Sequence, residues 1–314
     1  MSKIEIKSLH LIFGKDKNKA LKKLQEGKNK AEILKVTGCT VAVNNANLSI
    51  HEGEIFVIMG LSGSGKSTLL RCLNRLIRPT SGEIIINGTD ISKVSSKELL
   101  EIRRKELSMV FQHFGLLPHR TVLQNIAFGL ELQGIQKNER EKTAMDCMQQ
   151  VGLIGYENQL VSQLSGGMQQ RVGLARALAN NPEVLLMDEA FSALDPLIRV
   201  QMQDELLQLQ TKMKKTIIFI THDLSEAIKL GDRIAIMKDG EIVQVGTSEE
   251  ILTEPANEYV ERFVENVDRS KIITASSIMI DKPVVARFKK EGPEVLIRKM
   301  RQRNLISLPV VDDK

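Results

Sequence analysis

The sequence predicts an α/β fold in which helices cover both faces of a parallel sheet. Three observations support this fold class. The apolar run Glu54 to Met59 leads into a glycine-rich segment, Gly60 to Thr68, and then into a helix start at Leu69-Leu70. A second apolar run, Val184 to Met187, ends in two acidic residues. Apolar strand patterns and helical patterns then alternate along the chain, as they do in βαβ proteins.

The opening third of the chain is strand-rich with one helical insertion. Three stretches alternate apolar and polar residues as half-buried strands do: Lys3 to Phe13, Thr40 to Ile50 and Glu83 to Ile86. Between the first two, Lys15 to Lys35 is basic and helix-prone. A further helix is expected from Ser95 or Ser96 to about Arg104.

The remainder of the chain alternates helices with short apolar strands. The expected helices are residues 137 to 151, a helix that begins after Ser165, 196 to 214 and 224 to 230. Thr216 to Ile220 reads as a buried strand, and residues 233 to 245 read as a hairpin around Lys238-Asp239-Gly240. A helical tail, Pro255 to Asp268, precedes a new unit near Ser270. We therefore expect one large domain and one small one.

Composition limits the class of protein. The chain has 314 residues, 42% of them hydrophobic and 26% charged, which is ordinary for a soluble protein of two domains. No apolar stretch approaches the roughly 20 residues of a spanning helix, so we expect a cytoplasmic protein. The three cysteines have no metal or redox spacing. Aromatic residues are 4% of the chain and none interleave with its basic clusters, which argues against a nucleic-acid partner.

The glycine-rich segment predicts a site for a nucleoside triphosphate. Its nine residues are Gly60, Leu61, Ser62, Gly63, Ser64, Gly65, Lys66, Ser67 and Thr68. Backbone N–H groups in such a turn face inward and bind phosphate, and the helix dipole adds partial positive charge. Lys66 is expected to reach the β- and γ-phosphates, and Ser67 to bind Mg²⁺ through its hydroxyl. Thr68 would bond the α-phosphate or cap the helix.

The two acids after the second apolar run predict the hydrolytic chemistry. Asp188 is expected to anchor Mg²⁺ through water, and Glu189 to orient and deprotonate the attacking water. Two surface acids after a strand are the alternative.

Residues 164 to 171, Leu-Ser-Gly-Gly-Met-Gln-Gln-Arg, predict a second helix N-terminus built for an anion. Two phosphate-binding elements so far apart in one chain suggest that Ser165 and Gly167 serve a nucleotide held by another copy. A simple Ser-Gly-Gly helix cap is the alternative.

With these motifs in order from Ile4 to Asp268, the chain resembles the ATP-binding subunits of ABC transporters. The resemblance implies a P-loop NTPase cassette over residues 1–268, with a RecA-like core, an antiparallel β subdomain and a helical subdomain over about residues 113–180. It implies a signature segment of Leu164, Ser165, Gly166, Gly167 and Gln169 that acts in trans within a homodimer. Further implied roles are a Q-loop glutamine at Gln112 that contacts Mg²⁺, a D-loop with Ser192 and Asp195, and a switch histidine at His222.

The adenine-binding position departs from the common family pattern. Most members place an aromatic-glycine pair shortly before the strand that leads into the phosphate loop, and here Thr37-Gly38 stands there. Phe13-Gly14 is the better candidate if residues 15–35 are an insertion. Phe13 would then stack on the base, with a role as a core strand residue as the alternative.

The insertion resembles that of ATPase subunits of osmoprotectant importers, which move glycine betaine, proline betaine, carnitine or related compounds. Residues 111–122, 164–178 and 187–197 resemble the same subfamily. This resemblance implies separate permease subunits, an extracellular substrate-binding protein or domain, and a peripheral place on the cytoplasmic face of the membrane. The other functions considered are a soluble ABC ATPase acting on DNA or ribosomes, and an ABC ATPase for another solute.

Residues 272–279 and 305–312 resemble the two ends of the first half of a CBS module, which gives an incomplete CBS domain over residues 269–314. In related importers this region senses ionic strength, cyclic dinucleotides or anionic lipid. Arg298, Lys299, Arg301 and Arg303 are candidates for a lipid contact. A solvated charged face is the alternative.

Overall fold

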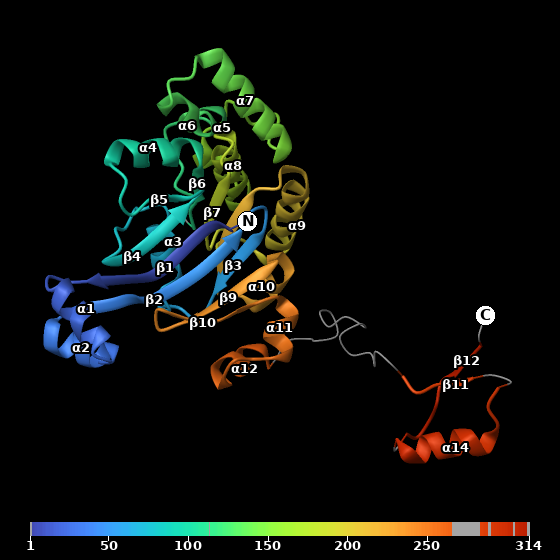
Figure 1. Ribbon diagram of the computed structural model, residues 1–314. Coiled ribbons are helices and arrows are strands. Elements are labelled where there is room, and N and C mark those ends of the chain that lie inside the picture. The colour runs from blue at the N-terminus through green and yellow to red at the C-terminus, as the bar shows by residue number, and fades with distance from the viewer. Residues whose placement is uncertain (1, 113, 266–282, 288–289, 304, 313–314) are drawn as a thin grey trace. The chain divides into compact units, whose positions relative to one another are not determined.

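The computed structural model describes residues 2–112, 114–265, 283–287, 290–303 and 305–312. The chain divides into two compact units, residues 1–267 and 268–314 (Figure 1). Within the described part of the chain, no helix is long and apolar enough to cross a membrane.

The centre of the first unit is a six-stranded sheet with the strand order β10-β9-β3-β8-β7-β6. Five neighbouring strands run parallel, and β10 joins the edge antiparallel to β9. Their bounds are β3 Ile55–Met59, β6 Leu107–Val110, β7 Val184–Asp188, β8 Thr216–Thr221, β9 Arg233–Lys238 and β10 Glu241–Gly246. Strands β3, β7 and β8 are buried throughout, as strands covered on both faces must be.

A second, antiparallel sheet has the order β2-β1-β4-β5. Its strands are β1 Ser2–Phe13, β2 Thr40–His51, β4 Ser81–Ile86 and β5 Thr89–Asp90. Inward-facing residues of this sheet, Ile4 and Ile50 among them, pack in the same core cluster as Phe56 and Ile58 of β3. One hydrophobic core therefore holds both sheets and the helix that follows the phosphate loop, α3 Lys66–Leu73.

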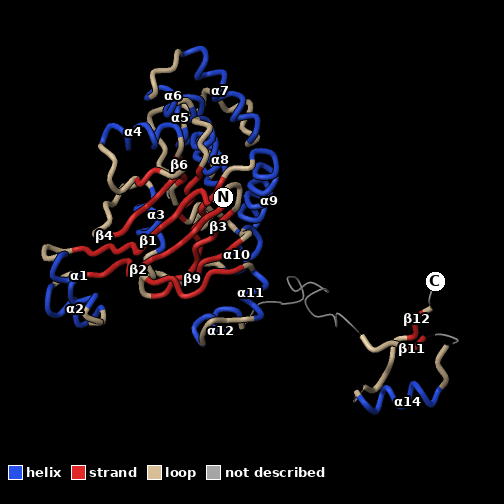
Figure 2. Tube along the Cα trace, in the orientation of Figure 1, coloured by secondary structure: helices blue, strands red, loops and turns tan. Residues whose placement is uncertain are grey.

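The helices of the first unit lie in several groups around these sheets (Figure 2). The helical subdomain consists of α5 Val122–Ile126, α6 Phe128–Leu132, α7 Lys137–Gln150, the short 3₁₀ turn Val161–Gln163 and α8 Gly166–Ala179. Around the parallel sheet lie α4 Ser96–Lys105, α9 Pro196–Met213, α10 Leu224–Leu230, α11 Ser248–Thr253 and α12 Glu258–Val264. The α/β fold class predicted from the sequence is confirmed.

The basic insertion between β1 and β2 forms two helices, α1 Lys17–Gln25 and α2 Lys30–Thr37, where the sequence predicted one helix-prone stretch. Gly27 separates them with a φ of 83°, and Asn29 begins α2 with a capping box to Glu32. Ala20, Ile33 and Cys39 form a small core of their own with residues of β1 and β2. The insertion is thus a packed extension of the antiparallel sheet.

Other elements also differ from the sequence prediction, which missed strand β6 and helix α11 and placed the tail helix too early. Strand β6 was not predicted, because Leu107–Val110 is a short run with a serine inside it and becomes a strand by pairing with β7. The predicted tail helix over Pro255 to Asp268 begins later, at Glu258, and the last three of its predicted residues lie outside the described part of the chain.

The second unit is small. Strands β11 Ala286–Arg287 and β12 Val310–Val311 pair in parallel, and helix α14 Pro293–Gln302 lies between them in sequence. Residues 272–279, which the sequence assigned to one end of the CBS half-module, lie outside the described part of the chain.

Candidate functional site

The phosphate loop joins the end of β3 to the first turn of α3, in the centre of the parallel sheet. Gly63 and Gly65 have φ values of 80° and 101°, a region that side-chain-bearing residues rarely adopt. A Cβ atom at Gly65 would lie 2.6 Å from the carbonyl oxygen of Ala42, and one at Gly60 would lie 2.2 Å from that of Met237. Glycine is therefore required at positions 60 and 65, because backbone atoms of the neighbouring strands lie too close to the loop for a side chain.

Lys66 is buried at the start of α3 and turns back over its own loop. Its ammonium donates to the carbonyl oxygens of Gly60 at 2.9 Å and Leu61 at 3.1 Å. Burial lowers the pKa of this ammonium, while the carboxylates of Glu189 and Asp188 act in the opposite direction. The charge of Lys66 is thus felt by Asp188, the predicted magnesium anchor, and by Glu189, the predicted general base.

Asp188 ends β7 and is 2% exposed. Its Oδ2 atom accepts a hydrogen bond from Arg71 Nη2 at 3.2 Å, and its Oδ1 atom has no hydrogen-bond partner among the described residues. A buried carboxylate oxygen left unpaired costs free energy unless a cation or donor meets it. Asp188 therefore fits the predicted role of a magnesium anchor, with Ser67 in the first turn of α3 as the second predicted ligand.

Glu189 lies at the meeting point of three predicted site residues. Its Oε2 atom is 3.2 Å from Gln112 Nε2 and 3.5 Å from His222 Nδ1. Gln112 Nε2 also lies 3.4 Å from the hydroxyl of Ser192, which in turn donates to the Glu189 carbonyl oxygen at 2.8 Å. Glu189 itself has a φ of 45°, a strained value for a residue with a side chain. The fold therefore brings Glu189, Gln112, His222 and Ser192 together.

The signature segment lies at the N-terminus of α8. Ser165 is the N-cap of this helix, and its hydroxyl accepts from the Met168 backbone N–H at 3.4 Å. Gln169 donates to the Leu164 carbonyl oxygen at 3.1 Å, which closes the segment on itself. A Cβ atom on Gly167 would lie 2.8 Å from Ile198 of α9, so this glycine permits close helix packing. Ser165 thus caps α8, and its hydroxyl lies at the exposed end of the helix, where the predicted signature role requires it.

The predicted D-loop connects Glu189 to α9. Asp195 is the N-cap of α9 and accepts from the Ile198 backbone N–H at 3.1 Å. Arg199 of the same helix donates to the carbonyl oxygens of Ser192 and Leu194, and lies 3.8 Å from the carboxylate of Asp223. Arg199 therefore ties the D-loop to the residue that follows His222.

Phe13 ends β1 directly before the inserted helices and is 42% exposed. It pairs with Thr40, and two residues further along β2 lies Ala42, whose carbonyl oxygen leaves no room for a Cβ atom at Gly65 of the phosphate loop. An exposed ring at this position is available for stacking, and the alternative of a buried core residue is wrong.

The sequence prediction missed the arginines that position the site. Arg71, Arg176 and Arg199 each lie on a helix at the edge of the site and bind a carboxylate or backbone carbonyl oxygens. Arg71 could have been considered from the sequence, because it lies only five residues after Lys66 on the helix that follows the phosphate loop. The contacts of all three depend on tertiary structure.

Comparisons with known proteins agree with this geometry. A family model described as ABC transporter matches residues 43–192. The glycine betaine/carnitine transport ATP-binding protein GbuA of Listeria monocytogenes is 62% identical over 311 residues, which is 99% of this chain and 78% of that protein. The glycine betaine transport ATP-binding protein OpuAA of Bacillus subtilis is 59% identical over 99% of this chain and 74% of its own length. The dimeric structure of MJ0796, a bacterial ABC transporter cassette, matches 78% of this chain and 98% of its own at 35% identity, with a TM-score of 0.66.

The chain therefore belongs to the ATP-binding subunits of ABC transporters, and it is an ATPase of that class. Within the class, it belongs to the family that includes these glycine betaine transport ATP-binding proteins.

Proposed function

We propose that the chain hydrolyses ATP to energise the uptake of glycine betaine or a related osmoprotectant, such as carnitine or proline betaine, through a separate permease. The observation that carries this proposal is the extent of the similarity. Relatives named for glycine betaine transport cover 99% of the chain, whereas a methionine import ATP-binding protein of Halalkalibacterium halodurans covers 73% at 48% identity. The match to the glycine betaine proteins thus extends well beyond the cassette shared by ABC importers.

The phosphate loop and its lysine would bind the nucleotide. The residues Gly60 to Thr68 offer backbone N–H groups at the start of α3. The Lys66 ammonium would exchange its hydrogen bonds to two carbonyl oxygens of its own loop for bonds to phosphate oxygens. Phe13 would stack on the adenine. Mg²⁺, when bound with the nucleotide, neutralises charge on the phosphates, and Asp188, Ser67 and Gln112 are the residues proposed to hold it.

Glu189 is the proposed general base. Its Oε2 atom would accept the proton of a water that attacks the γ-phosphate in line. His222 and Gln112, both within 3.5 Å of that atom, keep it oriented, and His222 would also stabilise charge that develops on the γ-phosphate. Lys66 supplies positive charge on the other side of the phosphates.

The active form is proposed to be a homodimer. Ser165 and Gly167 lie at the N-terminus of α8, where backbone N–H groups and the helix dipole favour an anion. In a head-to-tail dimer this end would meet the γ-phosphate held by the other copy. Dimeric solved structures of the MJ0796 cassette, one of them bound to ADP and Pi, support the proposal.

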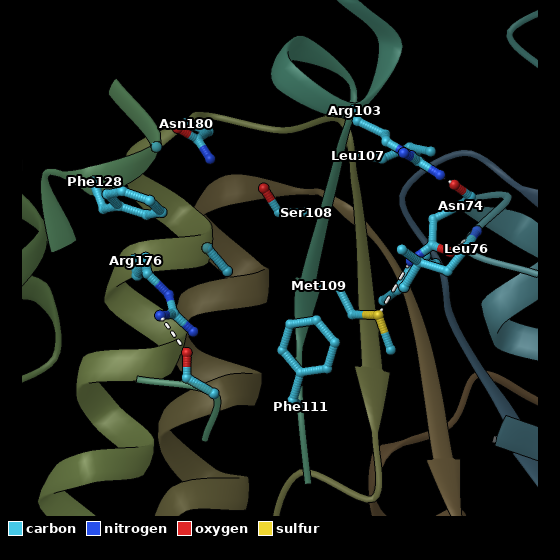
Figure 3. A pocket seen from close by; sticks show the side chains of 14 residues that line it. Asn74, Leu76, Arg103, Leu107, Ser108, Met109, Phe111, Phe128, Arg176 and Asn180 are labelled. Atoms are coloured by element: carbon cyan, nitrogen blue, oxygen red, sulfur yellow. Dashed lines mark hydrogen bonds between the residues drawn. The ribbon is translucent and has the colours of Figure 1, made fainter. Parts of the chain in front are cut away.

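An apolar cleft is the proposed docking site for the permease. It has a volume of about 370 Å³ and lies between α4, β6, α6 and α8 (Figure 3). Leu76, Met109, Phe111 and Phe128 line it, and the first and third of these side chains are exposed although large and apolar. Phe111 directly precedes Gln112, so a permease segment with apolar side chains seated here would bear on the loop that contacts Glu189.

The C-terminal unit is proposed to be part of a CBS domain that regulates transport by binding a nucleotide or anionic lipid. Its two parallel strands flank α14 in sequence, and α14 exposes Arg298 and Arg301. Lys299, also predicted as a lipid contact, is instead engaged within the unit, where it contacts the Glu291 carboxylate at 2.5 Å. A lipid contact would therefore rely on the arginines.

The assembled importer would place this chain on the cytoplasmic face of the membrane, with an extracellular binding protein or domain to deliver the solute. The test of the solute class is uptake in cells that lack the gene and are restored with it, at high osmolarity. Labelled glycine betaine, carnitine, trimethylamine N-oxide and methionine are compared. The proposal requires that the gene restore glycine betaine or carnitine uptake; restoration of methionine uptake alone would assign the chain to another solute.

A further inference from the structure

One face of helix α8 is shaped to receive the turn that follows Gln112. Gly166, Gly173 and Arg176 are seven and three residues apart, so they lie on the same side of the helix. A Cβ atom at Gly166 would lie 4.0 Å from the ring of Phe114, and one at Gly173 would lie 3.7 Å from the Phe114 carbonyl oxygen. These are ordinary van der Waals distances, so the Phe114 turn packs directly against this face of α8.

Arg176 fixes this turn through its backbone. Its Nη1 atom donates to the Gly115 carbonyl oxygen at 2.7 Å, the bond drawn at Arg176 in Figure 3. Its Nη2 atom donates to the Phe114 carbonyl oxygen at 2.9 Å. A planar guanidinium fork suits two neighbouring acceptors in a way that a lysine ammonium cannot. Among the described residues, no carboxylate lies within ion-pair distance of Arg176, so its contacts are committed to this turn.

The turn itself needs to be held. Phe114 and Gly115 have φ values of 55° and 56°, two consecutive residues in the left-handed region, and Phe114 is not a glycine. Such a conformation persists only when surrounding contacts determine it. The guanidinium of Arg176 is the contact that bridges both carbonyl oxygens.

The turn lies between two parts of the site. Two residues before it, Gln112 is within 3.2 Å of Glu189. The helix on which Arg176 lies begins with the signature serine, Ser165. We propose that Arg176 is a positioning residue that fixes the Phe114-Gly115 turn to α8. Gln112 is then held beside Glu189 only while α8 packs against this turn. This inference rests on the proposed roles of Gln112 and Glu189 and links them to the signature helix.

The test is a double-mutant cycle on ATP hydrolysis by the full chain, with Arg176→Ala, Gln112→Ala and the pair. If Arg176 acts through Gln112, Arg176→Ala lowers kcat by about tenfold in the wild-type background and by less than about twofold in the Gln112→Ala background. Binding of a fluorescent ATP analogue stays unchanged, because the phosphate loop is untouched. An equal loss of kcat in both backgrounds would overturn the inference, as would an unchanged kcat in Arg176→Ala.

Arg171 provides a matched control on the same helix. It donates to the Val151 carbonyl oxygen and pairs with Glu205, so it anchors α8 away from the Gln112 turn. Any effect of Arg171→Ala should be the same with and without Gln112. If Arg176→Ala does not fold, Arg176→Lys replaces it in the cycle. An ammonium cannot bridge both carbonyl oxygens as the guanidinium does, so Arg176→Lys should lower kcat in the wild-type background and leave it unchanged in the Gln112→Ala background. A wild-type kcat in Arg176→Lys, or an equal loss in both backgrounds, would overturn the inference. Because the cycle measures only ATP hydrolysis, its result does not depend on which solute the importer carries. A negative result for Arg176 can therefore be distinguished from a negative result in the uptake experiment.

Discussion

Replacing Arg71, the hydrogen-bond partner of Asp188, tests how much this ion pair stabilises the site. Arg71 donates to Asp188 Oδ2 at 3.2 Å, and the carboxylate is almost fully buried. Arg71→Met keeps the length and apolar part of the side chain but leaves a buried carboxylate without this counter-charge. We expect the folded state to be destabilised, since breaking a buried pair from one side leaves the Asp188 charge with less compensation, from Lys66 without Arg71.

The magnitude follows from the exposure of the two partners. At 3.2 Å the Coulomb energy is about 5 kcal/mol for an effective dielectric of 20 and about 1.3 kcal/mol for water. Because the Arg71 side chain is 47% exposed, solvent screens the pair and the estimate falls toward the lower bound, to about 2 kcal/mol. For a domain of this size that loss corresponds to a melting temperature about 4–8 °C lower.

Melting of the full chain without nucleotide measures this effect. Asp188→Asn removes the buried charge, so Arg71→Met in that background should cost much less than in the wild type. Arg78→Met, an exposed arginine just beyond α3, is the control and should change stability by less than about 0.5 kcal/mol. The reasoning is refuted if Arg71→Met lowers the melting temperature equally in the wild-type and Asp188→Asn backgrounds, or does not lower it at all.

Three further predictions concern catalysis, pH and thiol chemistry. Glu189→Gln should lower ATP hydrolysis by about 10² to 10⁴ with unchanged nucleotide affinity, because the amide keeps the side chain's shape but cannot take a proton; wild-type turnover would remove Glu189 from its role. Burial raises the pKa of Glu226, whose carboxylate accepts from Gln203 at 3.1 Å, so its charged form costs stability in the folded state. Because the pKa of Glu226 is higher in the folded than in the unfolded chain, stability falls as pH rises through the unfolded and then the folded pKa. Glu226→Gln should therefore stabilise the chain more at pH 8 than at pH 4. A melting temperature gain that is larger at pH 4 would contradict this. Burial raises the pKa of Cys72 to about 12 and that of Cys147 to about 11, so both should resist alkylation at pH 8 until urea unfolds the chain, and rapid labelling of native Cys72 would show that α3 is open.

Much of the site could be predicted from the sequence because its chemistry depends on local spacing. The glycines of the phosphate loop and Lys66 occupy fixed offsets between a strand and a helix, and those offsets are visible without a structure. Glu189 and His222 each follow a buried strand, and neighbouring parallel strands end at the same edge of a sheet. Their meeting at 3.5 Å therefore follows from the order of strands.

Other features depend on contacts between distant segments. Strand β6 exists because Leu107 pairs with Val184 at the sheet edge, and nothing in its own four residues distinguishes it from a loop. Arg176 binds a turn about sixty residues earlier in the chain, so its role depends on how α8 packs. Helix α11 is different, since Thr247 and Glu250 form a capping box whose spacing is present in the sequence. That signal could have predicted the helix.

The central claim is that ATP bound at this phosphate loop drives solute uptake, and uptake of labelled glycine betaine measures it directly. Cells lacking the gene are restored with the wild-type chain or with Lys66→Ala and assayed at low and high osmolarity. Lys66→Ala removes the ammonium that the loop places beside Asp188 and Glu189, without altering the cleft proposed for the permease. The account predicts that the wild-type chain restores uptake at high osmolarity and that Lys66→Ala does not. Uptake restored equally by Lys66→Ala would contradict it.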